Sequence, residues 1–294
     1  MTCRYSPFGP RAKAALRRPP GWPGRRPASA RLPIDPTGVA PATRHFNRRR
    51  YGERCPLPHF AKRTPAAHPE KDIALHSVYV FDAYGTLFDT GAAVARHAET
   101  LGASGRELAE VWRRKQLEYS WVRGLMGDAS RNFWDLTEDA LDYAFQKVGG
   151  VDPALREPLL DAYRDLDCYP EVPSTLRALK DKEARVAILS NGSRDMLSRA
   201  VRSAGLEDLV DELFSAEDCG QYKTAPAVYE MVTTQYRIYP DAVSFQSSNR
   251  WDIAGANRFG FHTVWINRKG EPDEYLDLRP DAILPDLKNL AGRL

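Results

Sequence analysis

The sequence predicts an α/β fold: a doubly wound parallel sheet, covered by helices, with a helical segment inserted after its first strand. Three observations lead to this prediction. Short apolar runs end in polar residues, helix-like segments separate the later runs, and a long helical stretch follows the first run. Short strands that are apolar throughout and are spaced by helices are typical of a parallel sheet buried on both faces.

The first predicted strand, Val78–Phe81, ends in a carboxylate. Asp82 follows it directly, and a turn containing Gly85 and Thr86 comes next. This order places Asp82 at the carboxyl edge of a buried strand, where open α/β sheets bind their ligands. An aspartate at that edge is a candidate nucleophile. Taken alone, the same residue is also compatible with a turn or a helix cap, although less so.

Helical patterns then dominate residues 91–168, which are predicted to form a helical cap domain. Ser104 and Glu107 have the spacing of a capping box, in which two side chains satisfy the first backbone groups of a helix. The helices are expected at Leu108–Met126, at Asn132–Val148, and from Asp152-Pro153 to about Asp167. The α/β core domain is accordingly expected at residues 77–90 and 169–294.

Strand and helix patterns alternate after Pro170. The apolar runs are Val186–Leu189, Ala242–Phe245 and His262–Ile266. Polar clusters follow the first two runs, Ser190 to Ser193 and Ser247 to Asn249, with Asp252 close behind. Because ligands bind where strand order reverses at the carboxyl ends, these clusters are expected to meet Asp82 in one crevice. Each cluster alone is also ordinary turn chemistry, and a lone lysine such as Lys223 would normally be a solvated surface charge.

Residues 1–76 differ sharply from the rest of the chain in charge and in proline content. They hold 16 Lys and Arg against 4 Asp and Glu, with 13 of the 22 prolines, whereas the remainder holds 26 against 35. Such a segment cannot bury enough apolar surface to order itself, so disorder is expected. Three explanations stay open: translation upstream of the true start, a targeting segment, or a basic arm for nucleic acid or membrane.

Cysteine, histidine and hydropathy patterns limit the class of protein. The four cysteines show no CxxC spacing, the six histidines show no HxH or HExxH pairing, and no apolar run has transmembrane length. A zinc site, a disulfide framework and a membrane span are therefore not expected. A soluble cytoplasmic protein is the expectation from these patterns.

The motifs together resemble the haloacid dehalogenase superfamily, and within it the (S)-2-haloacid dehalogenases. The segments that carry the resemblance are Asp82-Ala-Tyr-Gly-Thr-Leu, Trp112-Arg113-Arg-Lys-Gln-Leu117-Glu-Tyr-Ser-Trp121, Ser190-Asn-Gly-Ser, Tyr222-Lys223, Ser247-Ser-Asn-Arg-Trp-Asp252 and Trp265-Ile-Asn-Arg268. The resemblance covers about residues 77–294. It implies a Rossmann-like core with a helical cap, a small 2-haloacid substrate, no cofactor, no nucleic-acid or membrane partner, and a possible homodimer.

Two departures from the phosphatases of this superfamily bear on the reaction type. Tyr84 stands where those enzymes carry a general-acid aspartate, and Asp252 is the only carboxylate near the fourth motif, where they bind magnesium through an acidic pair. A halide leaves as a stable anion and needs neither group. The resemblance thus implies metal-independent hydrolysis of L-2-haloalkanoic acids to D-2-hydroxy acids through an aspartyl ester, with release of halide.

The resemblance also implies a role for each candidate site residue. The catalytic set is Asp82 as nucleophile, Lys223 to keep it ionised, Thr86 to stabilise the ester oxyanion, Arg113 to accept halide, Ser190 with Asn191 to bind the substrate carboxylate, and Ser247, Asn249 and Asp252 to position and deprotonate water. The substrate wall is Tyr84, Leu117, Phe133, Tyr229 and Trp251. Plain core packing explains such wall residues equally well.

Three positions differ from the family pattern. Thr224 follows the motif lysine where proline is usual, and Gln246 replaces an apolar strand residue. Arg250 replaces a small residue and is expected to add a cation beside Asn249 and Asp252. These departures remove no catalytic group but could alter the range of substrates.

Three other functions stay open at this point. The first is a hydrolase of the same mechanism that acts on another electrophilic carbon next to a carboxylate, such as a strained cyclic amino acid. The second is a metal-dependent phosphatase. The third is a nucleic-acid-binding protein that uses the basic residues 1–76, with the α/β fold as a scaffold.

Overall fold

The computed structural model describes residues 77–293, which all belong to one compact unit. The extension 1–76, for which disorder is expected, lies outside the described residues. So does the last residue of the predicted core, Leu294. The proposed boundary between core and cap domains is not tested by this single unit and stays a prediction.

The described strands form one sheet of six parallel strands, in the order β3-β2-β1-β4-β5-β6. Their bounds are β1 Val78–Phe81, β2 Arg185–Ser190, β3 Glu212–Ser215, β4 Val243–Ser247, β5 His262–Ile266 and β6 Ala282–Leu284. All four residues of β1 are buried, which explains why this central strand is apolar on both faces. The predicted doubly wound α/β fold is confirmed.

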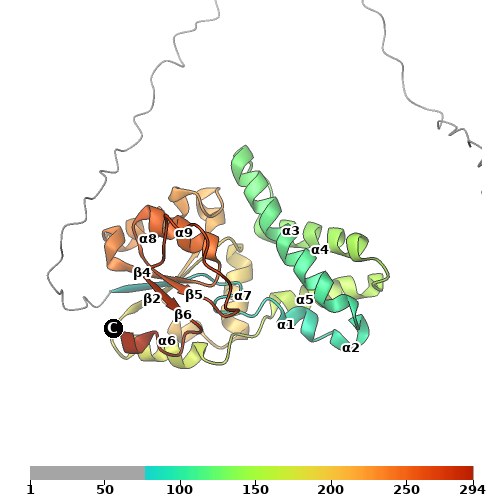
Figure 1. Ribbon diagram of the computed structural model, residues 1–294, viewed down its shortest axis with the longest axis horizontal. Coiled ribbons are helices and arrows are strands. Elements are labelled where there is room, and N and C mark those ends of the chain that lie inside the picture. Colours follow the sequence, from blue (N-terminus) through green and yellow to red (C-terminus); the bar gives the residue numbers. More distant parts are fainter. Residues whose placement is uncertain (1–76, 294) are drawn as a thin grey trace, which may run out of the picture. The chain divides into compact units, whose positions relative to one another are not determined.

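Four helices cover the two faces of the sheet: α6 Val172–Lys180, α7 Arg194–Ser203, α8 Pro226–Tyr236 and α9 Arg250–Phe259. Figure 1 shows α8 and α9 above the strands and α6 below them. The chain moves from β1 through β2 to β3 on one side, then returns to β4 on the other. Strand order therefore reverses between β1 and β4, and the crevice at their carboxyl ends is the position at which such sheets bind ligands.

Between β1 and α6 the chain forms the segment that we call the helical insert, which contains α1 Ala92–Ala95, α2 Ala98–Leu101, α3 Ser104–Met126, α4 Phe133–Val148 and α5 Arg156–Arg164. Figure 1 shows it beside the sheet. The indole N–H of Trp112 on α3 donates to the backbone carbonyl of Thr137 on α4 at 2.8 Å, which joins the two longest helices. Within residues 77–293, no helix has both the length and the apolar character needed to span a membrane.

The capping box expected at Ser104 is wrong. Ser104 is the first residue of α3, and the preceding Ala103 already has helical dihedral angles, φ −65° and ψ −24°, without a side-chain cap. The serine is therefore one position too far into the helix to act as the cap. A capping box does occur at the start of α4, where Asn132 and Asp135 each bind the other's backbone N–H at 3.0 and 3.1 Å.

Strand β4 extends two residues beyond the predicted apolar run. Gln246 and Ser247 continue the pairing with β5, and the backbone carbonyl of Gln246 accepts from the N–H of Asp82 at 2.9 Å. The buried amide of Gln246 donates to the hydroxyl of Ser244 at 2.6 Å, so one end of this polar side chain is satisfied. Backbone pairing thus places both Asp82 and the cluster after β4 at one sheet edge.

Candidate active site

A tight turn after β1 returns Thr86 to the side chain of Asp82. Gly85 has φ +92°, a left-handed conformation that glycine adopts without a steric penalty. The turn is closed by the N–H of Phe88, which donates to the carbonyl of Ala83 at 3.0 Å. As a result the hydroxyl of Thr86 donates to Asp82 Oδ2 at 3.0 Å.

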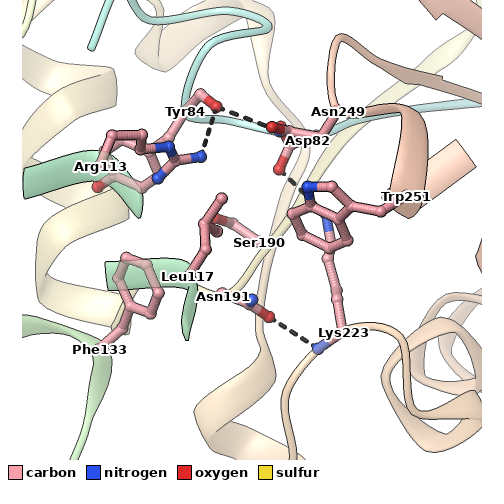
Figure 2. Close-up of a pocket in the computed structure, with 10 residues that line it drawn as sticks. All are labelled: Asp82, Tyr84, Arg113, Leu117, Phe133, Ser190, Asn191, Lys223, Asn249 and Trp251. Carbon is pink, nitrogen blue, oxygen red and sulfur yellow. Dashed lines mark hydrogen bonds and ion pairs between the residues drawn. The ribbon is translucent and has the colours of Figure 1, made fainter. Parts of the chain in front are cut away.

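The carboxylate of Asp82 accepts hydrogen bonds from three segments of the chain. Lys223 Nζ lies 3.1 Å from Oδ1, and Asn249 Nδ2 donates to Oδ2 at 2.8 Å, beside the contact from Thr86. Figure 2 shows Lys223 and Asn249 approaching Asp82 from the two loops that follow β3 and β4. Asp82 is 5% exposed, so these donors hold a nearly buried anion in one orientation.

Lys223 lies between two carboxylates in the interior. Its ammonium is 2.7 Å from Asp252 Oδ2 as well as 3.1 Å from Asp82 Oδ1, and the residue is 1% exposed. Burial alone would lower the pKa of Lys223, but the negative charges of Asp252 and Asp82 outweigh burial and raise the pKa. The interpretation of Lys223 as a solvated surface charge is wrong, and Thr224 does not displace it.

Asp252 is fully buried on the other side of Lys223. The hydroxyl of Tyr229 donates to Asp252 Oδ1 at 2.9 Å. Burial raises the pKa of Asp252 to about 6, with Lys223 opposing the rise and Asp82 adding to it. Among the buried carboxyl groups around Lys223, Asp252 is therefore poised to exchange a proton near neutral pH.

Ten side chains line a pocket next to this charged group: Asp82, Tyr84, Arg113, Leu117, Phe133, Ser190, Asn191, Lys223, Asn249 and Trp251. Figure 2 shows Arg113, Leu117 and Phe133 reaching it from the helical insert. The pocket has about 230 Å³ of empty space, part of it open to solvent. Only about 10 Å³ of this space admits the centre of a water-sized sphere, about the room that one water needs, so the pocket is narrow and suits only a small ligand.

The pocket carries hydrogen-bond donors that the protein does not fully use. Asn191 Oδ1 accepts from the backbone N–H of Lys223 at 2.8 Å, but the buried Nδ2 of Asn191 has no partner. Ser190 lies beside it, and its Oγ accepts from the N–H of Gly192 at 3.1 Å. Arg113 donates to the carbonyl of Tyr84 at 3.2 Å. A buried donor without a partner is a natural contact for an anionic group of a ligand.

Comparison with known proteins identifies the family. The sequence model of the haloacid dehalogenase-like hydrolases matches residues 76–260. The (S)-2-haloacid dehalogenase 1 of Pseudomonas sp. (strain CBS-3) is 46% identical over 197 residues, which cover 67% of this chain and 86% of that protein. This chain belongs to the haloacid dehalogenase-like hydrolase family.

Further members of the family agree at a finer level. The (S)-2-haloacid dehalogenase of Pseudomonas sp. (strain YL) is 44% identical over 209 residues, or 71% of this chain and 90% of that protein. The solved L-2-haloacid dehalogenase from Xanthobacter autotrophicus with chloropropionic acid covalently bound matches with a TM-score of 0.66 and 32% identity, covering 74% of this chain and 98% of that one. The resemblance to the (S)-2-haloacid dehalogenases is confirmed.

Three predicted residues of this dehalogenase-family site lie behind the pocket rather than in its lining. Thr86 and Asp252 act on Asp82 and Lys223 as described, and the hydroxyl of Ser247 accepts from the backbone N–H of Asn249 at 3.1 Å. Within the described residues, no group of three or more His, Cys, Asp or Glu side chains is arranged to hold a metal ion.

The structure corrects the expected place of Tyr229 in the substrate wall. Tyr229 is fully buried, does not line the pocket, and packs edge-on against Phe245 of β4 with ring centroids 6.0 Å apart. Because it lies on the sheet-facing side of α8, its hydroxyl meets Asp252 instead of the ligand space. Tyr229 therefore holds Asp252 in place and does not contact the ligand space.

The structure also corrects the expectation that Arg250 adds a cation beside Asn249 and Asp252. The guanidinium of Arg250 binds the loop after β5, with Nε 2.6 Å from Asp273 Oδ1 and Nη2 3.2 Å from the carbonyl of Tyr275. Its length carries the charge away from its own backbone position at the start of α9. In this chain Arg250 anchors a loop.

Two contributors to the site were missed. The backbone N–H of Ser248 donates to the hydroxyl of Thr86 at 2.8 Å, and the ring of Tyr163 stacks on Tyr84 with centroids 5.7 Å apart. A main-chain donor leaves no side-chain signal in a sequence. Tyr163 lies at the far end of the helical insert, so only the folded arrangement brings it to Tyr84.

Proposed function

We propose that this protein hydrolyses L-2-haloalkanoic acids to D-2-hydroxy acids through an ester on Asp82, without a metal ion. The observation that carries the proposal is the oriented carboxylate of Asp82 in a small pocket that also presents the unpaired amide of Asn191 and the guanidinium of Arg113. The solved relative from Xanthobacter autotrophicus, which carries covalently bound chloropropionic acid, supports a covalent route.

In the first step the carboxylate of Asp82 attacks C2 of the substrate from the side opposite the halogen. The new O–C bond forms as the carbon–halogen bond breaks and the halide leaves with the electron pair, so the carbon inverts. Asn191 Nδ2 and Ser190 bind the substrate carboxylate, and Arg113 receives the halide. The apolar wall of Tyr84, Leu117, Phe133 and Trp251 keeps water from the reacting carbon.

In the second step water attacks the ester carbonyl of Asp82. We assign Oδ1 as the oxygen that attacked, because Oδ2 accepts from both Thr86 and Asn249 and is thus prepared to carry the oxyanion. Such donors are each worth about 3 kcal/mol in the transition state. Asn249, held by Ser247, positions the water, and Asp252 takes its proton. The tetrahedral intermediate then collapses as the bond between the carbonyl carbon and Oδ1 breaks. Oδ1 leaves on the D-2-hydroxy acid with the proton from Asp252, and the carboxyl of Asp82 releases a proton to solvent and is restored as a carboxylate.

The pH dependence of kcat should report Asp252. Since this carboxyl must be unprotonated to accept a proton and its pKa is about 6, kcat is expected to fall as pH drops below about 6. The hydrogen bond from Tyr229 lowers the pKa of Asp252, so Tyr229→Phe should move the midpoint of this fall to higher pH. Steady-state rates across about pH 5 to 8 measure the midpoint.

Tyr236→Phe is the matched control, because Tyr236 lies on the same helix and contacts Phe214. Its midpoint should equal that of the wild type. An equal midpoint for Tyr229→Phe as well would exclude Asp252 as the titrating base.

The experiment that tests the proposed function is halide release from L- and D-2-chloropropionate in the presence of EDTA. Release from the L isomer alone, with D-lactate as product, is the expected result. No release from either isomer would contradict the dehalogenase proposal and favour a substrate with another electrophilic carbon, such as a strained cyclic amino acid. Hydrolysis of p-nitrophenyl phosphate that EDTA abolishes would establish a phosphatase and overturn the proposal.

We further propose that the helical insert acts as a cap, that the protein is a homodimer, and that it works in the cytoplasm. Exposed apolar residues near the end of α3, including Leu125 at 90% exposure and Met126 at 64%, support a surface for a second copy. The free thiols of Cys168 and Cys219 are compatible with a reducing compartment. Light scattering decides the oligomeric state, and the mass of a monomer would contradict the dimer.

A further inference from the structure

The two connections between the sheet and the helical insert lie side by side. The N–H of Tyr169 donates to the carbonyl of Leu87 at 2.9 Å, and the N–H of Asp89 donates to the carbonyl of Asp167 at 3.0 Å. We call residues 87–89 and 167–169 the linker pair. The first linker continues directly from the turn that carries Thr86, whose hydroxyl donates to Asp82.

Arg268, from the loop after β5, contacts one linker and the residues that flank both linkers. Nη1 is 2.6 Å from Glu171 Oε1, and Nη2 donates to the backbone carbonyl of Thr86 at 2.8 Å. The guanidinium carbon lies 3.7 Å from the ring centroid of Tyr169. The side chains of Arg268 and Glu171 are 14% and 7% exposed, so this is a mostly buried ion pair.

The contact with Thr86 has a direct route to the reacting carboxylate. Arg268 holds the carbonyl of Thr86, while the hydroxyl of the same residue donates to Asp82 Oδ2 at 3.0 Å and accepts from the N–H of Ser248 at 2.8 Å. Fixing both the main chain and the side chain leaves Thr86 little freedom to rotate. The planar fork of arginine can bind a carboxylate and a carbonyl at once, which a lysine ammonium does with less defined geometry.

We propose that Arg268 is a positioning residue for the hydrolysis of the Asp82 ester, acting through Thr86. This inference rests on the proposed function, in which Thr86 stabilises the oxyanion formed when water adds to the ester. When Arg268 no longer holds the backbone carbonyl of Thr86, the hydroxyl of Thr86 is no longer oriented toward Asp82 Oδ2. The first displacement does not need that oxyanion donor, so the second step slows more than the first.

Arg268→Lys is the test, because it keeps the positive charge near Glu171 and removes the fork. With L-2-chloropropionate we expect kcat to fall about 10- to 100-fold, as expected for an imperfectly placed catalytic group. Because only the hydrolysis of the ester is slowed, KM should fall with kcat, and kcat/KM should stay within about threefold. Intact-protein mass spectrometry during turnover should show the variant with an added propionate group on Asp82. A merely structural defect would lower the amount of active protein without accumulating this ester.

Arg199→Lys is the matched control. Arg199 on α7 binds both oxygens of Asp165 at 2.7 and 2.8 Å. It therefore also ties the core to the end of the helical insert, but through Asp165 rather than through Thr86. Its kcat should stay within about threefold of the wild type. An equal loss of kcat in both variants, or no ester in Arg268→Lys, overturns the proposal.

A crystal structure of Arg268→Lys gives a readout that needs no substrate. Thr86 Oγ1 beyond hydrogen-bonding distance of Asp82 supports the positioning role, and an unchanged distance contradicts it, even if the wild type proves inactive on haloacids. Should that variant fail to fold, Glu171→Gln removes the charged partner of Arg268 and should cause a smaller change of the same kind. Unchanged kcat and no ester in a folded Glu171→Gln would then contradict the proposal.

Discussion

Asp82→Asn is expected to abolish halide release, lowering kcat by more than about 10⁴-fold, as the loss of a covalent nucleophile does in other enzymes. The amide keeps the size of the side chain but has no anionic oxygen to displace halide. Ion chromatography of released chloride measures the effect. Asp89→Asn is the control, because Asp89 lies on the same segment and its carboxylate accepts from the N–H of Gly91 at 2.9 Å. The kcat of this variant should be unchanged.

Isotope labelling of the wild type separates two routes for water. If water attacks the ester carbonyl, a single turnover of the wild type in heavy-oxygen water should place the label in the peptide that contains Asp82. The first product molecule should then carry the original protein oxygen. Label in the first product, with none in the peptide, would mean direct attack of water on C2 and would remove Asp82 as nucleophile.

Lys223→Met is expected to lose activity by more than about 10³-fold and to destabilise the fold by about 3–5 kcal/mol. The variant leaves Asp82 and Asp252 close together without the buried ammonium that lies 3.1 and 2.7 Å from them. Removing one partner of a buried ion pair costs this much because the remaining charge stays desolvated. Urea unfolding measures the change in the free energy of unfolding.

The destabilisation of Lys223→Met should depend on pH in a defined direction. The pKa of Asp252 is already raised to about 6 by burial, and loss of the Lys223 charge raises it further. A carboxyl with a folded-state pKa above its unfolded value of about 3.9 destabilises the protein at higher pH and ceases to do so as it is protonated. The difference from wild type should thus be smaller at about pH 5 than at about pH 8.

Lys180→Met supplies the comparison for an exposed pair. Lys180 lies 2.6 Å from Asp211, but both side chains reach solvent, at 29% and 21% exposure. Pairs of this kind contribute about 1 kcal/mol or less. If Lys223→Met cost no more than Lys180→Met, the buried lysine would not be the counter-charge that the site requires.

The residues that line the pocket were easier to predict from the sequence than the strands and buried contacts that hold them in place. Most pocket residues lie soon after an apolar run or on the helix Ser104–Met126, where periodic or motif signals are strong. The exceptions are Phe133, the first residue of α4, and Lys223, eight residues after β3. Strand β6 was missed because its three residues, Ala282–Leu284, form an apolar run that is too short to indicate a strand. The burial of Lys223 could not be read from neighbouring residues, since the carboxylates that hold it lie 141 and 29 positions away.

Contacts made by long side chains were the least predictable. Arg250 and Arg268 both carry their charge well beyond their own backbone positions, to Asp273 in one case and to Glu171 in the other. A sequence pattern gives the backbone position of such a residue but not the direction of its side chain. For Tyr229 the pattern predicted an aromatic residue near the site, yet only the packing of α8 on β4 decides which neighbour its hydroxyl meets.

The position of β1 at the centre of the sheet has a consequence for synthesis on the ribosome. β1 is the first of the described strands to emerge, yet Asn249, which binds Asp82, lies 167 residues later. At about 5–20 residues per second, the strand waits roughly 10 to 30 seconds for that partner. During this time one edge of an entirely apolar strand has no neighbour to pair with, so the nascent chain is most exposed to aggregation before translation has reached β4.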